Sequence, residues 1–444
     1  MSKFSKFLFI LILITLSACN RPQAVPKGVP SDSDISDGTT DTPLGITMAS
    51  ETQPSSSGDQ VTSTPEVTDP TDDIPAEPTV DMTQALAGNP IQLYSAGTEI
   101  NLVEISMVNT NAGWGVGGVE SDYYHIFTTD DGGLTWQDVS PPQPGIAGTD
   151  AFIYLEYGVW DELSAWVAYS GAEYIWATHD GGVSWQASPL VFMTSGDGMF
   201  EVLDEDHVWF FQFLEGGMQK IFTAVNRSSD GGSTWEMILS PYDDATIQAF
   251  TKTGSDFISP QYGWLTRDFR GVDPFVRINF SLDGGISWDA VEIPPPPPLP
   301  DLFQSGLGDL FDPYLIAPGE GYFRLFARYF ENDVMIDRDF LYKTSDGGSN
   351  WEILEIPSGD IYYIDDQILY SVSRDIYRSV DSGLTWQKVK SVSWDGKFSF
   401  VDKNTAFGVA YDPDDNEYAL VKTIDGCQSF IIIEHRLLEP GTVR

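Results

Sequence analysis

The amino-acid sequence predicts an all-β protein, a seven-bladed β-propeller of four-stranded antiparallel blades that occupies residues 91–444. Three observations lead to this fold class. Short β-type runs separated by glycines begin at about residue 91. An eight-residue pattern then occurs seven times, with a mean spacing of about 49 residues, the size of one four-stranded blade. An apolar, mostly aromatic residue also precedes each copy of the pattern at a similar distance.

The first residues have the features of an export signal. Lys3 and Lys6 form a short basic start, and residues 7–16 are an apolar run too short to be a permanent membrane span. The run ends in Leu-Ser-Ala-Cys19, which resembles the bacterial lipobox, in which the cysteine is lipidated. We therefore expect residues 1–18 to be a lipoprotein signal peptide and Cys19 to carry a lipid. The protein would be extracytoplasmic and held at a bacterial membrane by that lipid alone.

Residues 19–90 begin with Cys19 and continue as an acidic linker rich in Ser, Thr and Pro, without an aromatic residue. Such a composition buries too little apolar surface to offset the entropy of ordering, so we expect a disordered tether. The whole chain has a net charge of -43. That charge repels phosphate backbones and argues against nucleic acid as a partner. The only other cysteine is Cys427, so a lipidated Cys19 leaves no intramolecular disulfide.

Each copy of the repeated pattern reads Ser/Thr-x-Asp-x-Gly-x-Ser/Thr-Trp, with small departures in the later copies. The pattern predicts a hairpin turn, in which the carboxylate accepts backbone N–H bonds and the glycines adopt positive φ. The closing aromatic residue begins the next strand and packs on the neighbouring blade. The aspartates are Asp131, Asp180, Asp230, Asp283, Asp346, Asp381 and Asp425, and the closing aromatic residues are Trp136, Trp185, Trp235, Trp288, Trp351, Trp386 and Phe430.

A second marker keeps the same spacing, 18 to 29 positions before the closing residue of each pattern. Its members are Trp114, Trp166, Trp209, Trp264, Tyr322, Ile368 and Phe407. Seven copies of two linked markers indicate seven similar structural units rather than a chance match.

The eight-residue pattern resembles the Asp-box, or bacterial neuraminidase (BNR), repeat. That resemblance implies that the seven aspartates are structural turn residues at the blade periphery, away from any ligand site; calcium ligation by them is the alternative. Asp-box repeats occur in sialidases, other glycosidases, sortilin-type receptors and photosystem II assembly-factor propellers. Seven regular copies are similar to the last group, whereas sialidases have six blades. The resemblance therefore implies an assembly or interaction platform.

The sequence offers no set of residues with a clear catalytic pattern. A retaining sialidase needs three arginines, a Tyr–Glu pair and an Asp, but the Arg-Ile-Pro motif is absent and Arg277-Ile278-Asn279 is the nearest string. Other arginines cluster nearby, and we expect them to pair with carboxylates on the blades: Arg267, Arg270, Arg324, Arg328 and Arg338. The histidines lack metal-ligand spacing. We therefore expect no catalytic residue and no metal or other cofactor, with calcium as the open alternative.

Several segments leave two interpretations open. The proline run at 293–300 is either a rigid spacer or a docking strip for a partner. The acidic loop at 412–417 is either a solvated hairpin tip or a calcium site. Tyr154, Tyr157 and Trp160 are either core residues or exposed contacts. We further expect residues 430–435 to form the last outer strand, with residues 91–94 as an extra sealing strand.

Taken together, these features predict a membrane-anchored, extracytoplasmic module that binds another envelope or membrane protein or helps to assemble a complex. The alternative is a carbohydrate-active protein, either a diverged sialidase-like glycoside hydrolase or a glycan-binding module. An arginine triad meeting a Tyr and a Glu at the propeller axis would favour the hydrolase.

Overall fold

A computed structural model describes residues 91–119, 123–142, 155–170, 174–192, 197–217, 220–243, 246–248, 251–269, 275–413 and 417–441. Their regular secondary structure is almost entirely β-strand, with one 3-10 turn, η1 (Thr246–Gln248), and one short helix, α2 (Leu302–Ser305). Within these ranges no helix is long and apolar enough to cross a membrane. The expected all-β class is confirmed.

The first three sheets each contain four consecutive antiparallel strands. The first has β1 (Asn101–Met107), β2 (Gly113–Gly118), β3 (His125–Thr129) and β4 (Thr135–Asp138). The second has β5 (Leu155–Val159), β6 (Ser164–Tyr169), β7 (Tyr174–His179) and β8 (Gln186–Pro189). The third has β9 (Asp197–Val202), β10 (Val208–Gly217), β11 (Lys220–Ser228) and β12 (Glu236–Leu239).

The next sheet has eight strands in two groups of four. One group is β13 (Lys252–Phe257), β14 (Gly263–Phe269), β15 (Arg277–Ser281) and β16 (Asp289–Glu292). The other is β17 (Leu307–Ala317), β18 (Glu320–Glu331), β19 (Val334–Thr344) and β20 (Glu352–Ile356). A short antiparallel pairing between β14 and β17, Asp268 with Asp309 and Phe269 with Gly308, joins the two groups.

Two further four-stranded antiparallel sheets complete the set. One contains β21 (Asp360–Tyr363), β22 (Leu369–Val372), β23 (Asp375–Ser379) and β24 (Gln387–Ser391). The last contains β25 (Asp395–Phe400), β26 (Ala406–Asp412), β27 (Glu417–Thr423) and β28 (Ile431–Ile433). A final two-residue strand, β29 (Arg436–Leu437), belongs to the first sheet.

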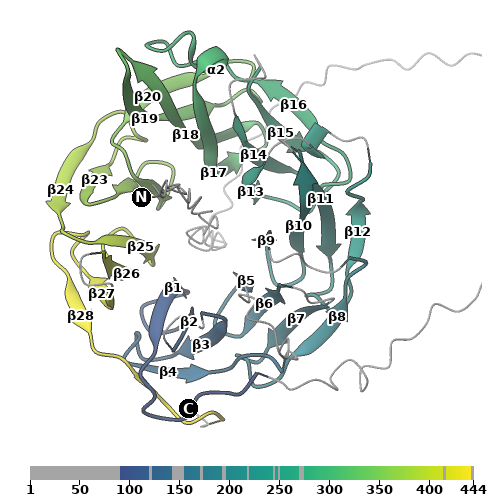
Figure 1. Ribbon diagram of the computed structural model, residues 1–444, viewed down its shortest axis with the longest axis vertical. Coiled ribbons are helices and arrows are strands. Elements are labelled where there is room, and N and C mark those ends of the chain that lie inside the picture. Colours follow the sequence, from purple (N-terminus) through teal and green to yellow (C-terminus); the bar gives the residue numbers. More distant parts are fainter. Residues whose placement is uncertain are drawn as a thin grey trace, which may run out of the picture. The chain divides into compact units, whose positions relative to one another are not determined.

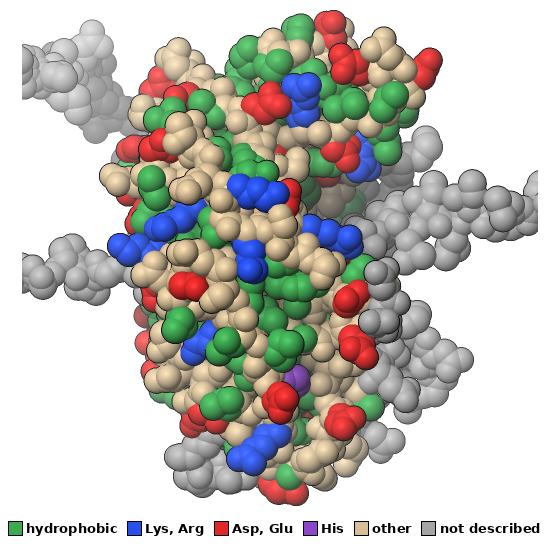
Figure 2. Space-filling model, turned by 90° about the vertical axis from the view of Figure 1, so that its left-hand side faces the viewer, with side chains coloured by type: hydrophobic (Ala, Val, Ile, Leu, Met, Phe, Trp, Pro, Cys, Tyr) green, Lys and Arg blue, Asp and Glu red, His purple; other side chains and the backbone are tan. Residues whose placement is uncertain are grey.

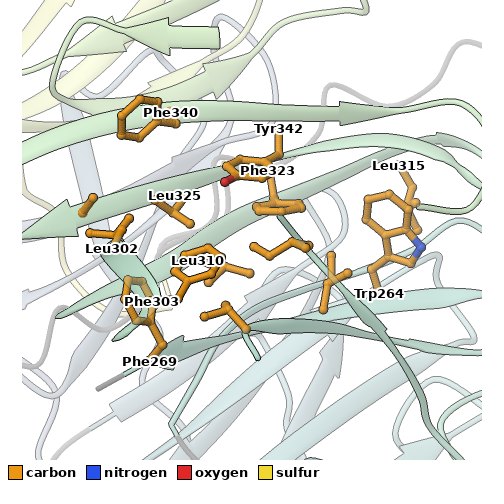
Figure 3. Packing of buried hydrophobic residues seen from close by; sticks show 14 residues of the cluster. Trp264, Phe269, Leu302, Phe303, Leu310, Leu315, Phe323, Leu325, Phe340 and Tyr342 are labelled. Atoms are coloured by element: carbon orange, nitrogen blue, oxygen red, sulfur yellow. The ribbon is translucent and has the colours of Figure 1, made fainter. Parts of the chain in front are cut away.

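The sheets follow one another around a common centre, with the first strand of each nearest the axis and the fourth at the rim (Figure 1). This radial arrangement of antiparallel sheets is a β-propeller. The core lies between neighbouring sheets. In the largest cluster, Trp264 of β14 and Phe269 pack with Leu310 of β17 and Phe323 of β18, which joins the two groups of the eight-stranded sheet (Figure 3).

The proline run crosses from β16 to β17 as a spacer. Ile293 and Pro296 are buried, and the carbonyl of Pro294 accepts a 2.8 Å hydrogen bond from the Tyr342 hydroxyl. The run then turns into α2, whose Phe303 packs edge-on against Phe269. The segment is thus built into the core on one side, which agrees with the spacer interpretation.

The two ends of the described chain meet in the first sheet. β29 pairs in parallel with β4, Arg436 with Thr135 and Leu437 with Trp136. The expected outer strand at 430–435 is observed as β28, but residues 91–94 form no strand, so the predicted sealing strand is wrong. The short parallel strand β29 joins the two ends of the ring instead. It does so because the chain continues past β28 and pairs with the open edge of β4.

Candidate functional site

The first copy of the repeated pattern is a turn held by its own side chains. The Asp131 carboxylate accepts hydrogen bonds from the Thr135 backbone N–H at 2.8 Å and from the Thr135 hydroxyl at 2.6 Å. The Thr129 hydroxyl donates to the same carboxylate and accepts from the backbone N–H of Gly133 at 3.0 Å. All of these bonds join residues two or four positions apart, so the eight residues are sufficient to build the turn.

The other six copies use the same bonds. In the fifth copy, Asn350 replaces the hydroxyl residue and donates through its side-chain amide to Asp346 at 2.7 Å. The carboxylates that accept from the backbone N–H four residues later are Asp180, Asp230, Asp283, Asp346, Asp381 and Asp425. Hydrogen bonds from the Ser429 hydroxyl and backbone lower the pKa of Asp425 to about 2, so this carboxylate is charged over the physiological range.

Each turn is also tied to the loop between the first and second strands of its own sheet. The N–H of the residue after the aspartate donates to that loop, as from Gly132 to the Asn111 carbonyl at 2.7 Å and from Gly426 to the Asn404 carbonyl at 2.9 Å. The next position has positive φ and packs against the preceding sheet. At Gly232, φ is 86°, and a Cβ atom would lie 2.5 Å from the Trp166 indole nitrogen, so a larger residue would clash.

The closing aromatic residues lie at the start of the outermost strands or directly before them. The Trp136 indole is buried and donates to the Gly133 carbonyl of its own turn at 3.0 Å. Trp185 instead donates to the Val139 carbonyl of the preceding sheet at 2.7 Å. Two further members donate within their own turns, Trp288 and Trp386, and three pack half-buried against core clusters, Trp235, Trp351 and Phe430.

The second marker connects each sheet to the next. The Trp166 indole donates to the Gly231 carbonyl at 2.9 Å, and the Trp209 indole donates to the Gly284 carbonyl at 2.8 Å; each acceptor belongs to the turn of the following sheet. In the sheet of β21–β24, however, Ile368 is the wrong residue. Tyr370 occupies the equivalent register position and donates to the Lys403 carbonyl of the last sheet at 2.8 Å.

The sequence contains a third periodic signal that the prediction missed. Five residues before the marker aromatic, an Asp, Asn or Ser side chain accepts two backbone N–H bonds, as Asp161 does from Leu163 and Ser164. The equivalent residues are Asn109, Asp204, Ser259, Asp365 and Asp402. Because Asp365 lies five positions before Tyr370, this spacing would have identified the correct marker.

The innermost strands carry polar side chains that sequence reasoning did not single out. The Ser106 hydroxyl of β1 lies 3.1 Å from the Tyr157 hydroxyl of β5, and Glu104 is the second hydrogen-bonding partner of Tyr157. The positive charge of Lys397 in β25 also acts on Glu104. Residues of the first two sheets therefore meet near the axis, within reach of a charge from the last sheet.

The chemistry open to this cluster is limited by its protonation. Burial raises the pKa of Glu104, against the opposing effects of Lys397 and the Tyr157 hydrogen bond. Burial, and then the charge of Glu104, raise the pKa of Tyr157 well above its usual range. Tyr157 therefore keeps its proton at neutral pH, and it could act as a nucleophile only if an adjacent base took that proton.

Four arginines of the two predicted clusters pair with carboxylates of neighbouring strands. Arg328 makes a bidentate pair with Asp337 at 2.8 and 2.9 Å. Similar exposed pairs are Arg277–Glu292 and Arg338–Glu355. Arg324 is buried and donates to Asp339 and to the Gly359 carbonyl, both at 3.0 Å. Arg267 is buried in β14, and Arg270 lies outside the described residues.

Within the described ranges, no group of three or more His, Cys, Asp or Glu is arranged to hold a metal ion. Tyr157 is held in the cluster just described, and Trp160 is half-buried against a core cluster. Cys19 and Tyr154 lie outside the described residues, as does the centre of the acidic loop at 414–416.

No protein-family model matches the sequence, and no curated protein sequence matches it either. Among solved structures, YCF48 from Cyanidioschyzon merolae is similar at 14% identity and a TM-score of 0.42, over 76% of this chain and 97% of that one. The Niastella koreensis GH74 enzyme is similar at 13% identity and a TM-score of 0.30, over 75% and 62%. The Fusarium graminearum GH93 α-L-arabinofuranosidase is similar at 11% and 0.38, over 63% and 92%.

Proposed function

We propose that this protein is a binding or complex-assembly module for another protein of the bacterial envelope. One observation supports this most directly: polar groups of the innermost strands are used to join neighbouring sheets. Glu201 of β9 accepts from the Ser255 hydroxyl at 2.8 Å and from the Phe257 N–H at 3.1 Å. Tyr362 of β21 accepts from the Phe398 N–H at 3.0 Å. Side chains whose hydrogen bonds join neighbouring sheets in this way stabilise a rigid scaffold rather than take part in a reaction.

We further propose that the propeller has seven blades, with the two groups of the eight-stranded sheet as the fourth and fifth. The seven turns then correspond to one Asp-box per blade, with their aspartates in structural roles and without calcium. The Asp carboxylates support this assignment, because their hydrogen bonds are used within their own turns. Residues 1–18 would be removed as a signal peptide, and Cys19 would anchor the acidic linker to the membrane.

The carbohydrate-active alternative is a hydrolase or a glycan-binding module. The Glu104–Tyr157 pair has the residue types of a sialidase nucleophile, which is the observation in its favour. Three arginines of the two predicted clusters, Arg277, Arg328 and Arg338, already form exposed ion pairs with carboxylates of the blades, which leaves them without the role of gripping a substrate carboxylate. We therefore rank binding above hydrolysis.

The proposal is tested by co-purification. The full-length chain, tagged after Arg444, is expressed in its native host, membranes are solubilised gently, and co-purifying proteins are quantified against a Cys19→Ala control. A stoichiometric partner that is lost with Cys19→Ala supports a membrane-anchored binding module. Absence of any enriched protein, together with hydrolysis of a sialoside or retention on a glycan array, would overturn the proposal in favour of the carbohydrate-active alternative.

A further inference from the structure

The outer strand of the last sheet, β28, has an unusual edge. We infer that this edge accepts an extended strand from a partner protein, and that the incoming strand is both acidic and apolar. The inference rests on the proposed binding function and deepens it by naming the surface and the chemistry of the partner. β28 differs from the other outer strands at the rim in how its edge is protected.

An open sheet edge presents unpaired backbone groups, and proteins protect such edges with charges, proline or a covering segment. Within the described part of the chain, β4 is covered by β29, and β8 ends in Pro189. The other four outer strands carry charged residues: Glu236 in β12, Asp289 and Glu292 in β16, Glu352 and Glu355 in β20, and Lys388 and Lys390 in β24.

β28 has none of these protections. It reads Ile431-Ile432-Ile433, and only Ile433 is buried. The exposed fractions of Ile431 and Ile432 are 61% and 72%. Isoleucine is also among the residues that most favour strands, so these side chains suit pairing with a further strand. β27 pairs with one side of β28, and no described strand pairs with the other side. The edge is therefore open, apolar and suited to strand addition.

The outer strand next to β28 in the ring is basic, in contrast to the domain as a whole. Residues 91–444 carry 54 acidic and 19 basic side chains, but β24 carries Lys388 and Lys390 and no acidic residue. Lysine and arginine side chains gather across the middle of this side of the molecule, next to hydrophobic ones (Figure 2). The Lys390 ammonium donates to the Gln428 carbonyl at 3.2 Å, which brings β24 against the turn that leads into β28.

The basic side chains remain accessible to a partner. Lys388 pairs with Asp375 at 2.8 Å and Arg374 with Asp395 at 2.9 Å, and all four side chains are about half exposed. Exposed pairs of this kind contribute little free energy, so carboxylates of a partner can replace them at small cost.

Charge also decides between possible occupants. Two copies of this chain would bring two strongly acidic domains together, and the β28 of a second copy has no carboxylate to meet the lysines of β24. An acidic strand of another protein meets the basic surface of β24 while its apolar residues cover Ile431 and Ile432. The predicted occupant is therefore a heterologous strand of alternating acidic and apolar residues.

The direct test uses fluorescein-labelled heptapeptides and fluorescence anisotropy with the full-length chain. The probe alternates Glu with Val, and the comparison peptides alternate Lys with Val or Glu with Ser. A fourth peptide repeats the Glu–Val sequence with N-methylated backbone amides. We expect saturable, salt-sensitive binding of the Glu–Val peptide alone, because strand addition needs carboxylates, apolar side chains and backbone N–H donors together.

Matched variants assign the binding to β28. Ile432→Lys should weaken binding by about tenfold or more, and the double change Lys388→Gln with Lys390→Gln should weaken it several-fold. The controls are Val183→Lys, at an exposed apolar residue of another turn, and Arg328→Gln, at an exposed ion pair of β18; both should bind as wild type. Equal binding of the N-methylated peptide, or wild-type binding by Ile432→Lys, would overturn the inference.

Co-purification with the Ile432→Lys variant separates this inference from the proposed function. Loss of a partner that the wild-type chain captures supports strand addition at β28. Retention of that partner would refute the β28 site while leaving the binding function intact.

Discussion

The backbone N–H of Met107 donates a 2.8 Å hydrogen bond to the Ser399 hydroxyl, 292 residues later in the chain. This bond joins β1 of the first sheet to β25 of the last, next to a buried cluster that contains Phe127, Trp136 and Phe407. The ring is therefore closed near the axis by a polar contact, and at the rim by β29.

Ser399→Ala should destabilise the domain, because it leaves the buried Met107 N–H without its acceptor. We expect a loss of about 1–3 kcal/mol in the free energy of unfolding, measured by urea denaturation followed by tryptophan fluorescence. Ser345→Ala, at an exposed turn position, is the control and should change stability by less than about 0.5 kcal/mol. Equal stability of the two variants would show that the Met107–Ser399 bond does not contribute to closure.

Arg324→Gln should be more costly. The Arg324 guanidinium is buried against Asp339 and lies within 4.8 Å of the Phe311 ring centroid, so its removal leaves a buried carboxylate without its cation. We expect a loss of about 3–5 kcal/mol by urea denaturation. Arg328→Gln removes a well-formed but exposed pair and should cost at most about 1 kcal/mol. A loss from Arg324→Gln no larger than that from Arg328→Gln would contradict the buried role.

The turn carboxylates should make stability depend on pH in the acid range. The pKa of Asp425 is lowered from 3.8 to about 2 in the folded protein, so its contribution is present above pH 3.8 and is lost as pH falls through about 2. Asp425→Asn removes this titration. The difference in urea midpoint between wild type and variant should be constant at neutral pH and should shrink between about pH 4 and 2. A difference that stays constant to pH 2 would contradict the assignment.

Cys427 should be chemically inert in the folded protein. Its side chain is fully buried, and burial followed by the charge of Asp425 raises the thiol pKa to about 12. We expect little alkylation by iodoacetamide at about pH 8 in buffer and complete alkylation in denaturant, read by mass spectrometry of the peptide that contains Cys427. Rapid alkylation of the native protein would show that the last turn opens locally.

Cys427 also stands where the other six turns have glycine. Its φ of 67° is in the left-handed region, which costs a residue with a Cβ about 1–2 kcal/mol. The thiol packs in the cluster with Tyr370 and Phe398, and this burial offsets the backbone cost. The degenerate seventh pattern therefore forms the same turn as the others.

The parts of the fold that the sequence predicts correctly are those built from neighbouring residues. The turn around Asp131 needs only side chains two and four positions away, and the hairpin on either side follows from alternating apolar residues. The position of each closing aromatic residue could be predicted for the same reason, because Trp136 and its equivalents directly follow their own turns. Asp161 and its equivalents are equally local, and their spacing of five residues from the marker aromatics is a signal of the same kind.

Other features were decided by tertiary structure, because they join residues far apart in the chain. Ser106 meets Tyr157 only because β1 and β5 are neighbouring innermost strands, and Tyr370 rather than Ile368 faces the next sheet because of its register with Arg378. The closure of the ring depended on which segment of the chain pairs with the open edge of β4. A two-residue strand such as β29 is too short to show a hydrophobic periodicity in the sequence. The sequence alone therefore determined the repeating unit, whereas the assembled ring determined how its ends are joined.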